Sequence, residues 1–247
     1  MAPRWACRYS GQHEGAGLVG RYYYSDVPFI ALWATRYVSV SRPFAAFLTD
    51  CAAGTLPHVA YVDPRFLGEG RGTSGDDHPH ADVRNGQAFL NQVHAAVTGG
   101  PAWPSTVLVM VYDEWGGFFE HVRPPTAPIP PADRAAGNGD GLRGFRVPCV
   151  VVAPWAQRGV VSHVVYDHTS VLRAIEWRWG LAPLTVRDAT ANNLFEVLDF
   201  GHPRRDAPVF AVPPGPFGAP CQVGGLAAEE WFALRAVAQN HAWPIAS

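Results

Sequence analysis

Two uninterrupted apolar runs rich in β-branched residues constrain the fold of this chain most strongly. They are "TVLVMVY" at residues 106–112 and "VPCVVVAP" at residues 147–154. Runs without polar alternation are typical of strands covered on both faces, as in a parallel sheet between helices. Helical patterns stand at 81–100, before the first run, and at 169–180, after the second. This order predicts an α/β fold with a largely parallel sheet.

Periodicity and end signals define the two helices. In 81–100, apolar side chains recur at spacings of three and four residues, and Asp82 stands in the first turn. Thr169 is the expected N-cap of the second helix, and Gly180 follows its end. Weaker patterns predict a buried strand at 58–62, short helices within 22–48, and helices beginning near 190 and spanning 227–240.

Composition excludes several classes of protein. The 247 residues are 48% apolar and 16% charged, as in a folded globular protein. A net charge of -2 without a basic run gives no electrostatic basis for binding nucleic acid or an anionic membrane. No apolar run reaches the ~18 residues of a membrane span. The first residues lack the pattern of a signal peptide, so we expect a soluble, cytoplasmic chain as written.

The four cysteines, at positions 7, 51, 149 and 221, are far apart in the sequence. Without a CxxC pair they favour neither a zinc ribbon nor a redox motif. We expect free, mostly buried thiols, although an even number of cysteines also permits disulfides.

Two adjacent acids, Asp113 and Glu114, directly follow the first apolar run. In parallel sheets, ligands gather beyond the carboxyl ends of the strands. Carboxylates at the end of a buried segment are costly unless a cation or hydrogen bonds compensate them. Gly116 and Gly117 allow a bend there, and His121 follows. The pattern therefore predicts a site, and its alternative is a strand-end turn with solvated acids.

The segment "SGDDHPH" is a second candidate, with Asp76, Asp77, His78 and His80 close together. Imidazole and carboxylate groups together suit a divalent cation or a phosphoryl oxygen. The structural alternative is that Asp77 caps the following helix and His78 only packs.

The segment "YDHTS" at 166–170 is a third candidate. Capping by Thr169 or Ser170 explains most of it, and Asp167 or His168 facing the site is the functional alternative. The absence of GxSxG argues against the common serine esterases. The nucleotide-binding motif GxxxxGK[ST], a GxGxxG directly after a strand and the zinc motif HExxH are absent too.

Together these segments resemble the bacterial phosphoesterase family of phospholipase C enzymes and acid phosphatases. The resemblance runs in the family's order up to about residue 200. It rests on "YYYSDVPFIALW", "AGTLPHVAYVDPRF", "GTSGDDHPHADVRNGQAFLNQV", "VYDEWGGFFEHVRPP", "RVPCVVVAPWAQRG" and "YDHTSVLRAIEWRWGL".

The resemblance implies an alkaline-phosphatase-like three-layer α/β sandwich and hydrolysis of phosphate esters, including phospholipids. It implies that Asp113 and Glu114 are catalytic acids that hold a divalent metal ion of unknown identity. His78 would be a catalytic residue that contacts the phosphoryl group. The substrate-binding residues would be Asp77, His121 and Trp115.

Three departures from the family pattern matter. The "ENxSFD" motif that usually begins the family, and the nucleophilic Ser or Thr after it, have no counterpart here. Trp115 replaces a commoner His, and Glu120 replaces a usual Asp. We therefore expect the C-terminal portion of the family domain at 1–202, followed by a Pro-rich linker and helix at 203–247. The alternative function is a folded but non-catalytic member.

Overall fold

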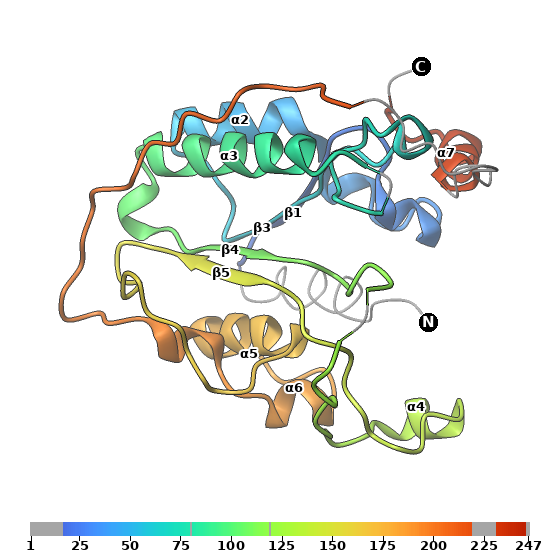
Figure 1. Cartoon of the computed structure of the whole chain (residues 1–247), viewed down its shortest axis with the longest axis vertical. Helices are drawn as coiled ribbons and strands as arrows, with labels where there is room; N and C mark the ends of the chain where they lie inside the picture. Colours follow the sequence, from blue (N-terminus) through green and yellow to red (C-terminus); the bar gives the residue numbers. More distant parts are fainter. Residues whose placement is uncertain (1–16, 80, 119, 219–230, 246–247) are drawn as a thin grey trace. The chain divides into compact units, whose positions relative to one another are not determined.

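The structure, a computed structural model, describes residues 17–79, 81–118, 120–218 and 231–245 (Figure 1). The chain divides into two compact units. Among the described residues, the first unit holds those up to Thr106 together with those from Asp206 onward, and the second unit holds Val107–Arg205. The proposed boundary at residue 202 stays a prediction.

A three-stranded parallel sheet forms the centre of the first unit. Its strands are β1 (Gly20–Tyr24), β2 (Ser41–Pro43) and β3 (Val59–Val62), in the order β2-β1-β3. Both neighbours of β1 run parallel to it. The predicted α/β class with a parallel sheet is therefore confirmed for this unit. Strand β3 coincides with the predicted strand at 58–62, but β1 lies at the start of a segment for which only short helices were predicted.

Tyrosines of β1 build the core beside this sheet. The Tyr23 side chain is fully buried and meets the Phe47 ring edge-on at 5.4 Å. Phe47 belongs to α2 (Phe44–Ala53), whose Asp50 Oδ2 accepts a hydrogen bond from the Tyr23 hydroxyl at 2.6 Å. Burial first, and then the Asp50 carboxylate, raise the pKa of Tyr23. Strand β1 thus carries a buried tyrosine hydroxyl, that of Tyr23, whose hydrogen bond is accepted by Asp50.

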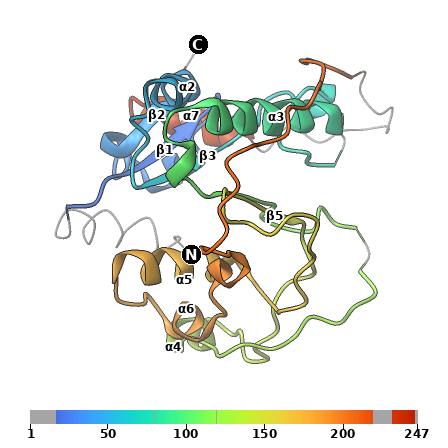
Figure 2. The same ribbon diagram turned by 90° about the vertical axis from the view of Figure 1, so that its left-hand side faces the viewer.

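The predicted helix at 81–100 is confirmed as α3 (Val83–Gly99), which packs beside α2 (Figure 2). Its N-cap is Asp82, which accepts the amide of Arg84. The suggestion that Asp77 caps this helix is therefore wrong, because Asp82 stands next to the first helical residue.

The C-terminal segment belongs to the first unit. The side chain of Asn85 in α3 donates to the carbonyl of Phe217 at 3.1 Å and accepts its amide at 2.7 Å. Helix α7 (Trp231–Asn240), within the predicted 227–240, packs on the 3-10 helix η1 (Phe29–Trp33). Both contacts join residues that are far apart in the sequence.

The second unit contains a two-stranded sheet of β4 (Leu108–Val111) and β5 (Cys149–Val152). Both strands lie within the predicted runs, but they pair antiparallel, so the predicted parallel arrangement is wrong here. They are also not covered on both faces, since Val150 is 50% exposed. The connection between them carries only α4 (Pro131–Ala135) and no crossover helix of the kind that parallel strands need.

Three short helical elements follow β5, namely α5 (His168–Trp179), α6 (Val186–Thr190) and the 3-10 helix η5 (Leu194–Val197). The N-cap of α5 is Asp167 rather than the predicted Thr169, and Gly180 ends the helix with a left-handed φ of 64°. The helix predicted to begin near 190 is wrong, since only a four-residue 3-10 turn forms there. The remaining 3-10 turns, all in the first unit, are η2 (Val38–Val40), η3 (Glu69–Arg71) and η4 (Trp103–Ser105).

A buried carboxylate joins α5 to α6. Asp188 is 1% exposed and accepts the amide of Thr185 at 2.8 Å and that of Leu184. Burial alone would raise the pKa of Asp188. Hydrogen bonds from Glu176 of α5, from Thr185 and from the Leu184 amide outweigh burial, so this pKa lies below its ordinary value.

Two cysteines lie in the described residues, and both are free, as predicted. Cys51 is buried, but Cys149 is exposed, which corrects the expectation of burial for the latter. Cys7 and Cys221 lie outside the described residues. Of the helices that the structure describes, none has both the length and the apolar character needed to cross a bilayer.

We expect Asp188→Ala to lower the free energy of unfolding by about 3 kcal/mol, because it leaves two buried amides without an acceptor. Urea denaturation followed by circular dichroism measures this change. Glu196→Ala, an exposed acid in η5, is the control and should change stability by less than about 0.5 kcal/mol. Equal effects of the two substitutions would contradict the role of Asp188.

The same carboxylate should make stability depend on pH. Because the pKa of Asp188 is lower in the folded chain, its contribution is present above the unfolded value of about 3.9 and disappears as pH falls through the folded value. Between pH 5 and pH 2, the wild-type chain should therefore lose more stability than Asp188→Asn. Parallel pH profiles of the two chains would show that other groups cause the acid sensitivity.

Candidate active site

The acid pair lies just beyond the end of β4, and both Asp113 and Glu114 are exposed. The expectation that these acids are buried is therefore wrong. Because water solvates both carboxylates, neither needs a cation to offset a cost of burial. Asp113 Oδ1 accepts the amide of Glu114 at 3.0 Å, and Glu114 Oε2 accepts the amide of Gly116 at 2.8 Å. Within the described part of the chain, neither carboxylate forms an ion pair. Each therefore presents an oxygen that a ligand can reach.

The turn after the acids depends on glycine. Gly116 and Gly117 have φ values of 67° and 75°, in the left-handed region that side chains with a Cβ rarely adopt. Trp115, 39% exposed, packs edge-on against Phe145 with ring centroids 4.8 Å apart. This contact holds the start of the turn against the segment that leads into β5.

An ion pair between Arg146 and Glu120 holds the other end of the same turn. Arg146 donates two hydrogen bonds to the Glu120 carboxylate, from Nε at 2.7 Å and from Nη2 at 2.8 Å. The Arg146 hydrogen bonds lower the pKa of Glu120 to about 2. His121 Nδ1 also lies 3.2 Å from Glu120 Oε1, and the imidazole is largely exposed. Glu120 is therefore engaged in fixing the turn, and His121 stands at its outer side.

His168 joins the start of α5 to the end of β4. Its Nε2 lies 2.8 Å from the carbonyl oxygen of Tyr112, the residue before Asp113. A ring nitrogen that bonds a carbonyl must carry the proton, which leaves Nδ1 as an acceptor when the ring is neutral. The preceding Asp167 caps α5 and forms an ion pair with Arg143 Nε at 3.1 Å. The capping interpretation of "YDHTS" therefore holds in part: the N-cap is Asp167, and Ser170 completes the capping box by accepting the Asp167 amide at 3.0 Å. His168 bonds the carbonyl of the residue before the acid pair.

The second candidate cluster lies in the first unit. His78 is half exposed, and its Nδ1 is 2.7 Å from Oε1 of Glu69 in η3. A carboxylate on Nδ1 fixes the orientation of an imidazole and directs Nε2 outward. Sequence reasoning missed Glu69, which lies nine positions upstream in the same Gly-rich loop.

The acids next to His78 hold its loop. Asp76 is partly buried, which raises its pKa, and its Oδ1 accepts the amide of His78 at 3.3 Å. Asp77 has a φ of 60° and lies directly over Gly86 of α3. A Cβ at Gly86 would stand 2.1 Å from Asp77 Oδ1, so any larger residue there would displace the Asp77 carboxylate. Asp77, predicted to bind substrate, therefore packs against the helix, and His80 lies outside the described residues.

The predicted residues thus form one group in each unit. In the second unit, one turn carries the acid pair, Trp115 and His121, and His168, a residue of the third sequence candidate, bonds the carbonyl of the residue before the acids. In the first unit, one loop carries Asp76, Asp77 and His78, with Glu69 added.

The acid pair offers two oxygen donors to a metal ion. In the described ranges, no group of three or more His, Cys, Asp or Glu side chains could hold one. Two carboxylates nevertheless fit the way proteins hold Mg²⁺, which keeps several waters and takes further oxygens from substrate phosphate. The donors present therefore suit a hard divalent cation that is bound together with its substrate.

Comparison with curated proteins finds similarity to phospholipases C. The chain is 37% identical to non-specific phospholipase C6 of Arabidopsis thaliana over 179 residues, which are 66% of this chain and 34% of that protein. For non-specific phospholipase C3 of the same plant, the identity is 30% over 216 residues, 79% of this chain and 41% of that protein. For phospholipase C B of Mycobacterium tuberculosis, it is 35% over 175 residues, 64% of this chain and 32% of that protein.

The chain therefore spans well under half the length of these relatives. The model of the phosphoesterase family matches residues 11–182, which include both groups of candidate residues. Its range covers β1 through α5 and so takes in most of both units. By this match, the chain belongs to the phosphoesterase family.

Proposed function

We propose that this chain is a phosphoric ester hydrolase of the phospholipase C type, acting on phospholipids or related phosphate esters. Family membership and the names of its relatives support hydrolysis of a phosphate ester. The observation that carries the proposal is the exposed acid pair beyond the end of β4, whose turn is clamped at both ends. A site of this kind is built before any ligand arrives, which limits the ordering cost of binding.

In this proposal, Asp113 and Glu114 hold a divalent cation. The cation, when bound, neutralises charge on the phosphoryl oxygens and makes an attacking hydroxyl more acidic. Trp115 and Phe145 form an apolar wall beside the acids, and the Glu120–Arg146 clamp keeps the turn in place. His168, through its bond to the Tyr112 carbonyl, holds α5 against the end of β4 and so positions Asp113.

By the resemblance to the family, His78 is the proposed catalytic residue that contacts the phosphoryl group of a substrate. Glu69 accepts a hydrogen bond from Nδ1, which orients the ring and directs Nε2 outward. The half-exposed position of His78 leaves its other nitrogen accessible to a substrate. Asp77 contributes indirectly, because its contact with Gly86 holds the loop that carries His78.

We expect Asp113→Asn to lower the rate of metal-dependent hydrolysis of p-nitrophenyl phosphorylcholine at least ~100-fold, because a neutral amide binds a hard cation weakly. The rate is measured with Mg²⁺, Ca²⁺, Mn²⁺ and Zn²⁺ in turn, and EDTA should abolish it. Asp140→Asn is the matched control: it is also an exposed acid that accepts a nearby backbone amide, from Leu142 at 3.0 Å. Unchanged turnover in Asp113→Asn would overturn the assigned role.

The same assay separates hydrolysis from the alternative of a folded, non-catalytic member. Turnover by the wild-type chain with any of the four metals supports the hydrolase. A folded chain without turnover on either p-nitrophenyl phosphorylcholine or p-nitrophenyl phosphate, with all four metals, supports the alternative.

We expect His78→Ala to reduce kcat ~100-fold and Glu69→Gln ~10-fold, with little change in KM, as for removal of a catalytic histidine and of its orienting group. The matched control is His202→Ala, because His202 Nδ1 also bonds an acid, Asp199 Oδ2 at 2.8 Å, on the surface. Equal losses in His78→Ala and His202→Ala would show that a surface pair of this type contributes only to folding.

A further inference from the structure

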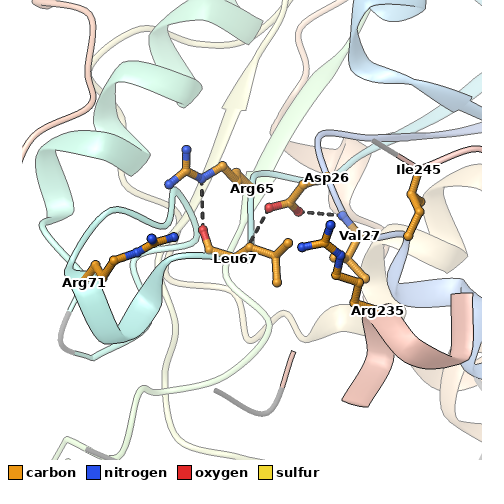
Figure 3. A pocket seen from close by; sticks show the side chains of 7 residues that line it. All are labelled: Asp26, Val27, Arg65, Leu67, Arg71, Arg235 and Ile245. Atoms are coloured by element: carbon orange, nitrogen blue, oxygen red, sulfur yellow. Dashed lines mark hydrogen bonds between the residues drawn. The ribbon is translucent and has the colours of Figure 1, made fainter. Parts of the chain in front are cut away.

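A pocket of about 240 Å³ lies in the first unit (Figure 3). It is enclosed by the turn after β1, the loop after β3 and helix α7. Its lining residues are Asp26, Val27, Arg65, Leu67, Arg71, Arg235 and Ile245. Three of these seven residues are arginines, and the volume is below that of a typical site for a drug-sized ligand. The pocket therefore suits a small anion.

The only acid in the lining is already satisfied. The Asp26 carboxylate accepts three backbone amides, from Val27 at 2.6 Å, from Phe66 at 3.1 Å and from Leu67 at 2.9 Å. These bonds stabilise its charge locally and join the turn after β1 to the loop after β3 (Figure 3). Asp26 therefore shapes the pocket and does not need an arginine as its partner.

One arginine is held in place by the protein itself. Arg65 donates from Nε to the Leu67 carbonyl at 2.9 Å and from Nη2 to the Thr73 carbonyl at 2.8 Å. A further bond reaches the Thr73 hydroxyl at 2.9 Å. No acid takes part in these bonds, because the three acceptors are two carbonyl oxygens and a hydroxyl oxygen.

The other two arginines have no such partners. Among the described residues, the side chains of Arg71 in η3 and Arg235 in α7 have no hydrogen-bond, ion-pair or ring partner. They stand on opposite sides of Leu67 in Figure 3. Together with Arg65, they give the lining three positive charges against one satisfied carboxylate. Guanidinium groups bind phosphate oxygens in pairs of parallel hydrogen bonds, which makes unpartnered arginines suited to this anion.

We propose that this pocket binds a phosphate dianion through hydrogen bonds from Arg71 and Arg235. Arg65, which is held in place by the protein, contributes a further positive charge. The phosphate group is either inorganic phosphate or the terminal group of a small phosphomonoester. Binding here needs neither Asp113 nor Glu114, so the inference stands apart from the proposed hydrolysis. It adds a phosphate-recognising site to the unit that also carries Glu69 and His78, built from other side chains.

Isothermal titration calorimetry of the full chain in EDTA tests the proposal, with inorganic phosphate and phosphocholine as separate ligands. We expect Arg71→Gln and Arg235→Gln each to weaken binding about tenfold, as for loss of one charged hydrogen-bonding group, and the double variant about a hundredfold. Arg36→Gln is the matched control, because Arg36 is an exposed arginine of the same unit outside the pocket. Its affinity should stay within twofold of wild type.

The outcomes separate the two sources of phosphate and the two sites. Binding of inorganic phosphate alone assigns the pocket to the free ion, and binding of both ligands extends it to phosphomonoesters. Asp113→Asn should bind as tightly as wild type. Circular dichroism confirms that each variant is folded. Absence of saturable binding of either ligand to the wild-type chain, or equal affinity of the folded double variant, overturns the proposal.

Discussion

The antiparallel pairing of β4 with β5 is the interaction on which the candidate active site depends. It fixes the end of β4, from which the acid pair emerges, and it brings the start of β5 alongside, so that Phe145 and Arg146 can reach the turn after the acids. His168 adds a third support from α5. The end of β4 is thus held by its pairing with β5, by the segment that leads into β5 and by α5. These contacts position the exposed turn that carries the acid pair.

Exposure of the acid pair changes the physical argument for a metal site. A buried pair would need a counter-charge in order to fold. An exposed pair folds without one, because water solvates it, and any affinity for a cation is then additional. The Glu120 carboxylate shows the contrast, since Arg146 occupies both of its oxygens and lowers its pKa to about 2. Of the three acids in this turn, only Asp113 and Glu114 therefore retain oxygens for a ligand.

Local signals in the sequence predicted much of the fold, and long-range pairing explains most of the misses. The helix α3 and the strands β3, β4 and β5 follow from apolar patterns, which depend on neighbouring residues alone. The direction in which β4 and β5 pair depends on the path of the chain between them, which an apolar run does not encode. Glu69 was missed for the same reason: its bond to His78 is made by the folding of a loop, and neither residue signals the other by spacing.

The amide side chain of Asn85 has a consequence for the evolution of this chain. It donates to and accepts from the same residue of the C-terminal segment, Phe217, so neither an acid nor an aliphatic side chain can replace it without losing one of the two bonds. The segment that it secures leads on to α7, which supplies Arg235. A substitution at position 85, inside the family-matched range, can thereby release Phe217, which lies outside that range. The tail and the core of the first unit should accordingly drift in sequence together.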